Sequence, residues 1–476
     1  MAERRGAVRV TGETGNRAIR DRPDRIVLLI LFVALVLRLQ LASTQAYIHD
    51  ESNTSIPLSK TISFTPGDLN LPLRGQNHGA LPAYVVKASS EVFGTTPLGY
   101  RGLHVLLSLA TIALLSRLAR QWYGVQAARW TALLLACNEY YLTVSSHATA
   151  HVPHLFFVAV ALYAFSRFLA TERAAYLYGA GAAVGVAFYC KETSALLLPI
   201  FFVAMLRRQQ RHWFRSPHLY LACLTFAVLL APDLLWNART NPETAQVTYS
   251  GQPAAQATYR SHLSRVGGLG FSPYPLMFYG RDAVQAVATR VTGQPLKDET
   301  PEYPSMNVAL GVVFVGAVLL TSIRTRALDG LAGFLLVAFW GVFGFFTLIA
   351  KGNAPGQLDP VSWIWVETTM LSASLLAGAR LAELTGAARI AVWALAGAAL
   401  LYASGAPVAG LARLATWAGQ ETVSAFSHAL QVLAIDAVAG IRSRPLWALG
   451  IAIGGGFAAG VVLGFVGGWW ARRRNQ

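Results

Sequence analysis

Residues 26–52 read IVLLILFVALVLRLQLASTQAYIHDES, and they join the two features around which the chain is organised. The run from Ile26 to Ala42 is apolar and long enough to cross a membrane as a helix. It is followed by Ile48-His49-Asp50-Glu51-Ser52, where two carboxylates and a histidine stand at the predicted boundary between the membrane and water. A carboxylate at such a place is costly unless it is solvated or paired, so it is a functional candidate by default.

The composition agrees with a chain that lies mostly in the membrane. Of 476 residues, 54% are hydrophobic and only 13% are charged, whereas about 25% are charged in a typical soluble protein. The apolar residues fall in long runs, many of them close to the roughly 20 residues that a membrane-spanning helix needs. The sequence therefore predicts an all-α polytopic membrane protein.

The apolar runs predict about twelve membrane-spanning helices. They are Ile26–Ala42, Gly102–Trp122, Trp130–Val144, Val152–Leu169, Tyr176–Tyr189, Thr193–Leu206, Leu219–Trp236, Met306–Ile323, Leu328–Ala350, Val361–Ala379, Ile390–Ala406 and Leu446–Trp470.

The distribution of the formal charge of +16 predicts the orientation in the membrane. Short basic clusters, such as Arg207–Arg215 and Arg472–Arg474, separate alternate pairs of apolar runs, as the positive-inside rule expects of cytoplasmic loops. We therefore expect a multi-pass protein of the inner (plasma) membrane with both termini in the cytoplasm. No basic stripe is interleaved with aromatic residues over a soluble domain, so we do not expect nucleic acid as a partner.

This topology divides the chain into three parts. Residues 1–25 form a polar, arginine-rich cytoplasmic tail, and we expect the first span to be an uncleaved signal anchor. Residues 26–406 form the transmembrane domain, with long outer loops at 43–100 and 237–303 and an amphipathic helix near Tyr84–Phe93. Residues 407–476 hold an outer interfacial segment, the last span and a basic cytoplasmic tail.

The acidic pair Asp50-Glu51 has three interpretations that the residues alone leave open. A carboxylate at the outer end of a span can remove a proton from an attacking hydroxyl group as a general base. It can also bind a cation, or it can cap the start of a following amphipathic helix.

Two other polar segments are expected on the same face of the membrane. His78 precedes a turn and an amphipathic helix, where it can contact an anionic group or be an ordinary loop histidine. The pair Lys191-Glu192 interrupts an apolar stretch. There the lysine can neutralise a phosphate, or it can reach the interface beside its own counter-ion.

A histidine cluster and three single cysteines do not predict a metal site. His147, His151 and His154 cluster between the third and fourth predicted spans, and the first two are spaced to share one helical face. That spacing can bind zinc, but the glutamate of the zinc metalloprotease motif is missing, so a polar helix end is the better interpretation. The cysteines form no Cys-x-x-Cys pair, so neither a zinc site nor a redox motif is supported, and we expect them to pack as small hydrophobic residues.

The order of these features resembles the lipid-dependent glycosyltransferases of the GT-C fold. The closest resemblance is to the family 39 branch of protein O-mannosyltransferases and aminoarabinose transferases, and it covers roughly the first half of the chain. It rests on Asp50-Glu51, Gly67-Asp68, His78, Gly94, Tyr100-Arg101-Gly102, Gly185–Phe188 leading into Lys191-Glu192, Ala231-Pro232 and Leu235-Trp236-Asn237. Two positions depart from the family pattern: Gly79-Ala80 stands where Pro-Pro is usual, and His151 replaces a second acid.

The resemblance implies a sugar transfer from a polyprenyl-phosphate donor to an acceptor hydroxyl group on the outer face. It implies that Asp50 is the general base, with Glu51 beside it as the second catalytic candidate. It further implies that His78 and Lys191 bind the phosphate, and Arg74, Glu192 and His151 complete the expected substrate site. The expected partners are the lipid-linked sugar, an acceptor glycan, lipid or protein, and the bilayer. We expect neither a metal nor a further cofactor.

Two alternatives differ from this interpretation in class. A transporter or flippase for a lipid-linked or anionic substrate would keep charged residues near the middle of the membrane and would show related halves. Here the charged residues gather at the predicted outer face, and no internal repeat is evident. The second alternative is an inactive scaffold of the same fold, in which Asp50 would be dispensable.

Overall fold

The structure is a computed structural model that describes residues 24–73, 78–206, 210–239, 246–249, 252–255, 274–293, 305–306, 308–325, 330–348 and 366–386. The last two predicted spans, 390–406 and 446–470, lie outside the described residues. So do the predicted segment 407–444, residues 1–23 of the predicted tail, and Arg74.

Five described helices are long and apolar enough to cross a membrane. They are α1 (Arg25–Thr44), α4 (Pro97–Tyr123), α7 (His151–Thr171), α10 (Pro217–Arg239) and α14 (Gly330–Leu348). Three shorter apolar helices accompany them: α8 (Ala174–Phe188), α9 (Leu197–Met205) and α13 (Val308–Arg324). The prediction of a helical, multi-pass membrane protein is confirmed, whereas the count of twelve spans stays a prediction.

The predicted third span, 130–144, is divided in the structure. Helix α5 (Val125–Ala136) ends before Asn138, and the short helix α6 (Glu139–Val144) follows it. The Asn138 side chain accepts a hydrogen bond from the backbone N–H of Tyr141 (2.9 Å), which is the usual cap of a new helix. The apolar pattern alone did not predict this break, because it continues across the cap.

The first outer loop contains short helices, as the sequence predicted. A π-helical turn, η1 (Glu51–Ser55), leads into α2 (Ile56–Thr61), and α3 (Leu81–Phe93) covers the predicted amphipathic stretch. Gly94 ends α3 with φ of 85°, a conformation that favours glycine. Thr96 then caps α4 through a hydrogen bond from Gly99 N (3.1 Å).

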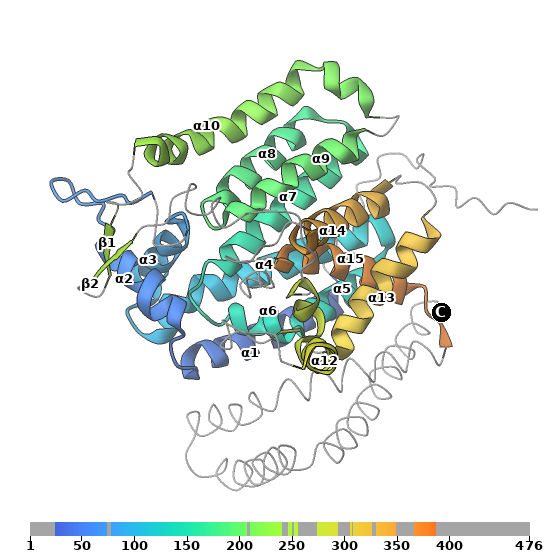
Figure 1. Ribbon diagram of the computed structural model, residues 1–476, viewed down its shortest axis with the longest axis horizontal. Helices are drawn as coiled ribbons and strands as arrows, with labels where there is room; N and C mark the ends of the chain where they lie inside the picture. Colours follow the sequence, from blue (N-terminus) through green and yellow to red (C-terminus); the bar gives the residue numbers. More distant parts are fainter. Residues whose placement is uncertain are drawn as a thin grey trace, which may run out of the picture.

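Close approaches at glycines hold the helices of the bundle together. A Cβ on Gly181 of α8 would lie 2.7 Å from the carbonyl oxygen of Ala222 in α10, so only glycine fits there. Gly378 makes a similar approach from α15 (Thr369–Ala382) to α5. Figure 1 shows α8 lying between α7 and α10, in agreement with the packing of these helices in the structure.

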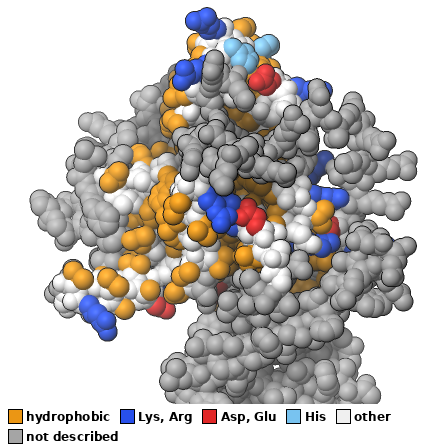
Figure 2. Space-filling view, turned by 90° about the vertical axis from the view of Figure 1, so that its right-hand side faces the viewer, with side chains coloured by type: hydrophobic (Ala, Val, Ile, Leu, Met, Phe, Trp, Pro, Cys, Tyr) orange, Lys and Arg blue, Asp and Glu red, His pale blue; other side chains and the backbone are white. Residues whose placement is uncertain are grey.

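The outer surface of the bundle is largely apolar. Exposed large hydrophobic side chains are numerous on α1, α10 and α13, including Phe32, Leu224, Val228, Leu320 and Ile323. Figure 2 shows one face, on which hydrophobic side chains form a broad region and charged side chains are few. In water such a surface would cause aggregation, whereas in a bilayer it matches the hydrocarbon.

The predicted second outer loop contains regular structure of its own. Strands β1 (Gln246–Tyr249) and β2 (Gln252–Ala255) form a two-stranded antiparallel hairpin, which an all-helical prediction does not include. Helix α12 (Tyr274–Thr292) follows, with a kink at Gly280. Helix α12 packs against α13, where Gly311 approaches the Tyr279 carbonyl group.

The bundle has two chemically different ends. At the first, which we call the site end, α1 and α8 end and α4, α7 and α15 begin. At the opposite end, the Asp24 carboxylate caps α1 and pairs with Arg129 of α5 (2.9 Å). Burial favours the neutral form of Asp24, but its hydrogen bond and attraction to Arg129 outweigh burial and lower its pKa.

Candidate active site

The two neighbouring carboxylates, Asp50 and Glu51, occupy different environments at the site end. The Glu51 side chain is fully buried and forms a bidentate ion pair with Arg101. Arg101 Nε donates to Glu51 Oε1, and Arg101 Nη2 donates to Glu51 Oε2, both at 2.7 Å. The backbone N–H of Ala148 donates to Oε1 as well (2.6 Å). Planar, bidentate, charge-assisted pairs of this kind are stronger than hydrogen bonds between neutral groups.

Arg101 uses its remaining donors to fix the end of α1. Its guanidinium group donates to the carbonyl oxygens of Ala42 (2.8 Å), Gln45 (2.9 Å) and Ala46 (3.0 Å). These carbonyl groups lie where α1 ends and therefore lack helical partners. The Glu51–Arg101 pair thus ties together α1, α4 and the segment before α7, and it holds residues 45–51 in place.

Asp50 is half-buried and lies at the start of η1, but its side chain makes no capping hydrogen bond to that turn. The helix-cap interpretation of Asp50 therefore has no support in the described contacts. Its charge acts on His151, more than a hundred residues later in the chain. Asp50 thus lies close enough to the polar cluster formed by α7 and the residues that follow α8 for its charge to act there.

A second pair of predicted site residues, His78 and Glu192, meets at the same end. His78 Nδ1 lies 3.1 Å from Glu192 Oε2, and both side chains are partly exposed. The loop can come this close because residue 79 is glycine: a Cβ there would lie 2.4 Å from the carbonyl oxygen of Tyr189. The departure from the family pattern at Gly79 is therefore accommodated by a close backbone contact.

Lys191 and His151, which the sequence also singled out, lie deeper in a buried cluster around Glu367. Glu367 is fully buried just before α15. Lys191 Nζ lies 2.9 Å from Glu367 Oε1 and 2.9 Å from His151 Nδ1. Two further side chains, those of His154 and Tyr140, also contact the Glu367 carboxylate.

His147 lies beside the buried Glu51 carboxylate. Its Nδ1 donates to the Thr143 carbonyl oxygen (2.8 Å), and its Nε2 lies 4.0 Å from Glu51. Burial lowers the pKa of His147 below its usual value, although the nearby Glu51 charge acts in the opposite direction. The side chain is therefore held largely neutral at physiological pH.

The structure thus brings together predicted site residues from four separate segments. Of the predicted site residues, Asp50, Glu51, His78, His151, Lys191 and Glu192 all lie at the site end, whereas Arg74 is outside the described residues. Their roles in substrate binding and catalysis stay predictions.

Sequence reasoning missed three members of this site: Arg101, Tyr140 and Glu367. Glu367 carried a usable signal, because it is a lone carboxylate inside the predicted span 361–379, and such residues are functional candidates by default. Arg101 was part of a quoted motif, but nothing in the sequence named its partner. Tyr140 resembled an ordinary interfacial aromatic residue.

The cluster does not resemble a metal centre. Within the residues that the structure describes, no group of three or more histidine, cysteine, aspartate or glutamate side chains could hold a metal ion. The Lys191 ammonium group lies against both His151 and Glu367, where it would repel a cation. The expectation that the chemistry needs no metal or cofactor stays a prediction.

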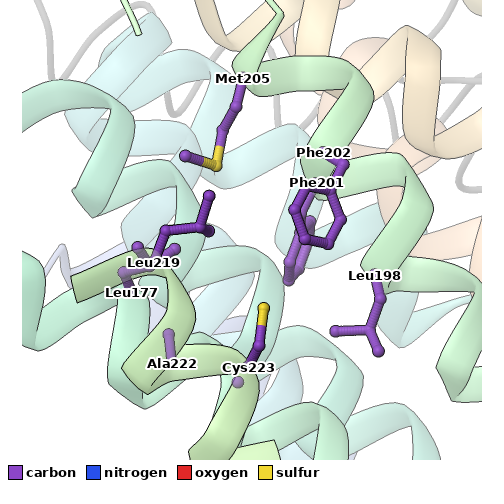
Figure 3. A pocket seen from close by; sticks show the side chains of 9 residues that line it. Leu177, Leu198, Phe201, Phe202, Met205, Leu219, Ala222 and Cys223 are labelled. Carbon is purple, nitrogen blue, oxygen red and sulfur yellow. The ribbon is translucent and has the colours of Figure 1, made fainter. Parts of the chain in front are cut away.

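A separate apolar pocket lies between α8, α9 and α10, away from these polar groups (Figure 3). Its lining residues include Leu177, Leu219 and Cys223, which lie near the beginnings of α8 and α10 and hence toward the opposite end of the bundle. With no ionised side chain in its lining, this pocket lacks the groups that an acid–base reaction needs.

Comparison with known proteins shows that the region around these residues is similar to a described family. Residues 77–236 match the sequence model of the family described as dolichyl-phosphate-mannose-protein mannosyltransferase. The matched segment includes His78, His151 and Lys191, but neither Asp50 nor Glu367. No curated protein matches the chain by sequence.

The fold is similar to that of ArnT from Cupriavidus metallidurans. The crystal structure of ArnT bound to undecaprenyl phosphate gives a TM-score of 0.56 at 19% identity, and the match covers 92% of this chain and 75% of that one. The apo state of ArnT gives 0.54 at 18% identity over the same shares, 92% and 75%. The oligosaccharyltransferase AglB from Archaeoglobus fulgidus gives 0.45 at 13% identity over 91% of this chain and 56% of that one.

The family match and the ArnT fold confirm the predicted resemblance to GT-C glycosyltransferases. The family match also agrees with the predicted enzyme class, since the matched family is described as a mannosyltransferase. The part of the chain that matches the family model contributes α3 to α10, the helices that carry most of the candidate site.

Proposed function

We propose that this membrane protein transfers a sugar from a polyprenyl-phosphate donor to an acceptor hydroxyl group, with Asp50 as the general base. The observation that carries the proposal is the meeting of Asp50, the His78–Glu192 pair and Lys191 at one end of the bundle. These residues lie in three distant parts of the sequence, and each was expected in this site from its own segment.

In the proposed reaction, the acceptor oxygen attacks the anomeric carbon of the donor sugar. The bond from that carbon to the phosphate oxygen breaks, and its electron pair leaves with the lipid phosphate. The Asp50 carboxylate takes the hydroxyl proton, a role that contributes about 10²- to 10⁴-fold to the rate of such reactions. Because Glu51 is committed to Arg101, we assign it to positioning residue 50 and not to proton transfer.

The leaving phosphate needs positive charge or hydrogen-bond donors to stabilise it. Lys191 and His78 supply these groups, and Glu192 orients His78 through their 3.1 Å contact. A lipid tail can reach such a site from the side, because α1, which ends at the site, presents apolar side chains outward. The bound undecaprenyl phosphate in the ArnT crystal structure supports a donor of this lipid class.

We place this reaction on the outer face of the plasma membrane, with residues 26–406 as the catalytic domain. The support is the clustering of basic residues at the opposite end, where Arg129, Arg324 and Arg380 lie. The positive-inside rule assigns that end to the cytoplasm. In the described part of the chain, no observation favours the alternative of a transporter or flippase.

The proposal is tested by Asp50→Asn and Asp50→Ala in a host whose envelope glycans are profiled. Both variants should lose the transferred sugar while the protein accumulates to its normal level. Glu91→Gln is a matched control, because Glu91 is an exposed carboxylate in the same outer loop and pairs only with Lys87 in the described contacts. Full transfer by both Asp50 variants would exclude Asp50 as the general base.

A further inference from the structure

The Glu367 carboxylate is surrounded by hydrogen-bond donors on every side. Oε2 accepts from Tyr140 Oη (2.5 Å) and lies 2.7 Å from His151 Nδ1, and Oε1 accepts from Lys191 Nζ (2.9 Å) and lies 3.0 Å from His154 Nδ1. A carboxylate has about four acceptor sites, and these four groups occupy all of them when both imidazoles carry a hydrogen on Nδ1. Such an arrangement explains how a carboxylate remains charged without contact with water.

The Lys191 ammonium group has more hydrogens than it has acceptors among the described residues. The His151 Nδ1 atom carries one hydrogen when it donates to Glu367, and it then cannot accept from Lys191. Of the three ammonium hydrogens of Lys191, only the one directed to Glu367 then has an acceptor among the described residues. The remaining two are available to a ligand; in the other tautomer, in which His151 Nδ1 accepts from Lys191, one remains available.

Lys191 is also the donor that can most easily leave Glu367. It lies in the non-helical segment between α8 and the 3-10 turn η2 (Glu192–Leu196), and its side chain is long and flexible. The other three donors are aromatic or imidazole rings on α6 and α7, where packing fixes them. His154 Nε2 is buried without a partner among the described residues.

We propose that Glu367 is a positioning residue that holds Lys191 in the empty site and releases it to the phosphate group of the lipid. This inference rests on the proposed function, because it assigns the phosphate of the donor to Lys191. When the phosphate binds, Tyr140, His151 and His154 continue to hold the Glu367 carboxylate. When the lipid phosphate leaves, Glu367 takes Lys191 back and thereby assists product release.

The variant Glu367→Gln separates this role from a purely structural one. Glutamine keeps the size and one acceptor oxygen, but it no longer neutralises the ammonium group. The released Lys191 should bind undecaprenyl phosphate more tightly, by at least about tenfold, the lower end of the coupling measured for close charge pairs. Donor KM and kcat should both fall, because the product leaves more slowly.

The experiment measures the affinity of the purified full-length protein for undecaprenyl phosphate, with undecaprenol as the probe that lacks the phosphate. Glu383→Gln is the matched control, since Glu383 is an exposed carboxylate that pairs with Arg324 and Arg380 at the opposite end. In a Lys191→Met background, Glu367→Gln should change the affinity by less than about twofold, the error of additive effects.

Each result decides one claim. If the wild-type protein binds undecaprenyl phosphate no better than undecaprenol, the proposed lipid donor is wrong and the Glu367 inference falls with it. If the wild-type protein binds but folded Glu367→Gln binds equally or more weakly, only the Glu367 inference is overturned. Should Glu367→Gln not fold, Glu367→Asp replaces it: the shorter side chain loosens Lys191, and unchanged affinity then contradicts the inference.

Discussion

At the scale of single residues, the contrast between Asp50 and Glu51 shows how neighbouring carboxylates acquire different tasks. Both carboxylate oxygens of Glu51 accept hydrogen bonds, from the Arg101 guanidinium group and from the Ala148 backbone N–H, and the side chain is completely shielded from solvent. Asp50 remains half-buried, and its charge acts on His151. The ion pair therefore fixes the backbone from which the neighbouring carboxylate acts.

Glu51→Gln should destabilise the protein, whereas Asp50→Asn should not. Removing one charge of a buried pair leaves Arg101 without its counter-ion and is expected to lower the free energy of unfolding by about 3–5 kcal/mol. Thermal unfolding of the purified variants in one detergent measures the difference. Equal stability of Glu51→Gln and the wild type would show that the Glu51–Arg101 pair does not hold the site together.

His147 should make stability depend on pH. Its pKa is lowered in the folded state from the ordinary value of 6.5, so the unfolded chain takes up the proton first as the pH falls. The contribution of neutral, buried His147 is complete above that value and is lost progressively below it. The midpoint of thermal unfolding should therefore fall between pH 7 and pH 5, and by less in His147→Gln.

Substitution of His212, an exposed histidine at the opposite end, is the control for this pH dependence. His212→Gln should leave the pH profile of the unfolding midpoint unchanged. A profile that His147→Gln leaves identical to the wild type would remove His147 as the titrating group.

At the scale of secondary-structure elements, one glycine determines how the first outer loop meets the end of α8. Gly79→Ala would force a methyl group onto the Tyr189 backbone, which cannot yield without moving α8. His78 should then move away from Glu192, and the KM for the donor should rise with little change in protein yield. Gly316→Ala is the control, because no atom lies near that position in α13; an unchanged donor KM in Gly79→Ala would contradict the close contact.

Much of the element arrangement could be predicted from the sequence, because apolar runs and caps act locally. Helix α3 and its end at Gly94 follow the amphipathic pattern and the glycine that stops it. The break at Asn138 was missed because one capping side chain interrupts a run that stays apolar on both sides. The partner of Arg101 could not be predicted either, since contacts between residues fifty positions apart depend on how the helices pack.

Glu367 shows which part of the site could be predicted from the sequence and which part could not. A lone acid in an apolar run signals function, but its four donors come from α6, α7 and the end of α8, and no local pattern joins them. The same holds for Lys191, which was expected to face a phosphate and is found on an internal carboxylate. With the role we propose for Glu367, the two interpretations of Lys191 that the sequence left open describe two states of one site. Lys191 is the paired lysine when the site is empty and the phosphate ligand when the lipid is bound.

At the scale of the whole molecule, the two ends of the bundle should face opposite sides of the membrane. Cysteine at position 60, exposed on α2, should react in intact cells with a maleimide that cannot cross the membrane. Cysteine at position 211, exposed in η3 (Arg211–Arg215), should react only after the membrane is made permeable. Cys223 is replaced by serine in both, because it is only partly buried; the reverse labelling pattern would place the site in the cytoplasm.

The most direct test of the account is sugar transfer by the purified protein in proteoliposomes. Wild type and Asp50→Asn are supplied with polyprenyl-phosphate-linked sugars and an extract of envelope acceptors, and the transferred sugar is counted. The account predicts transfer by the wild type and by Glu91→Gln, and a rate at least about 10²-fold lower for Asp50→Asn at equal stability. Transfer by Asp50→Asn at the wild-type rate would contradict it.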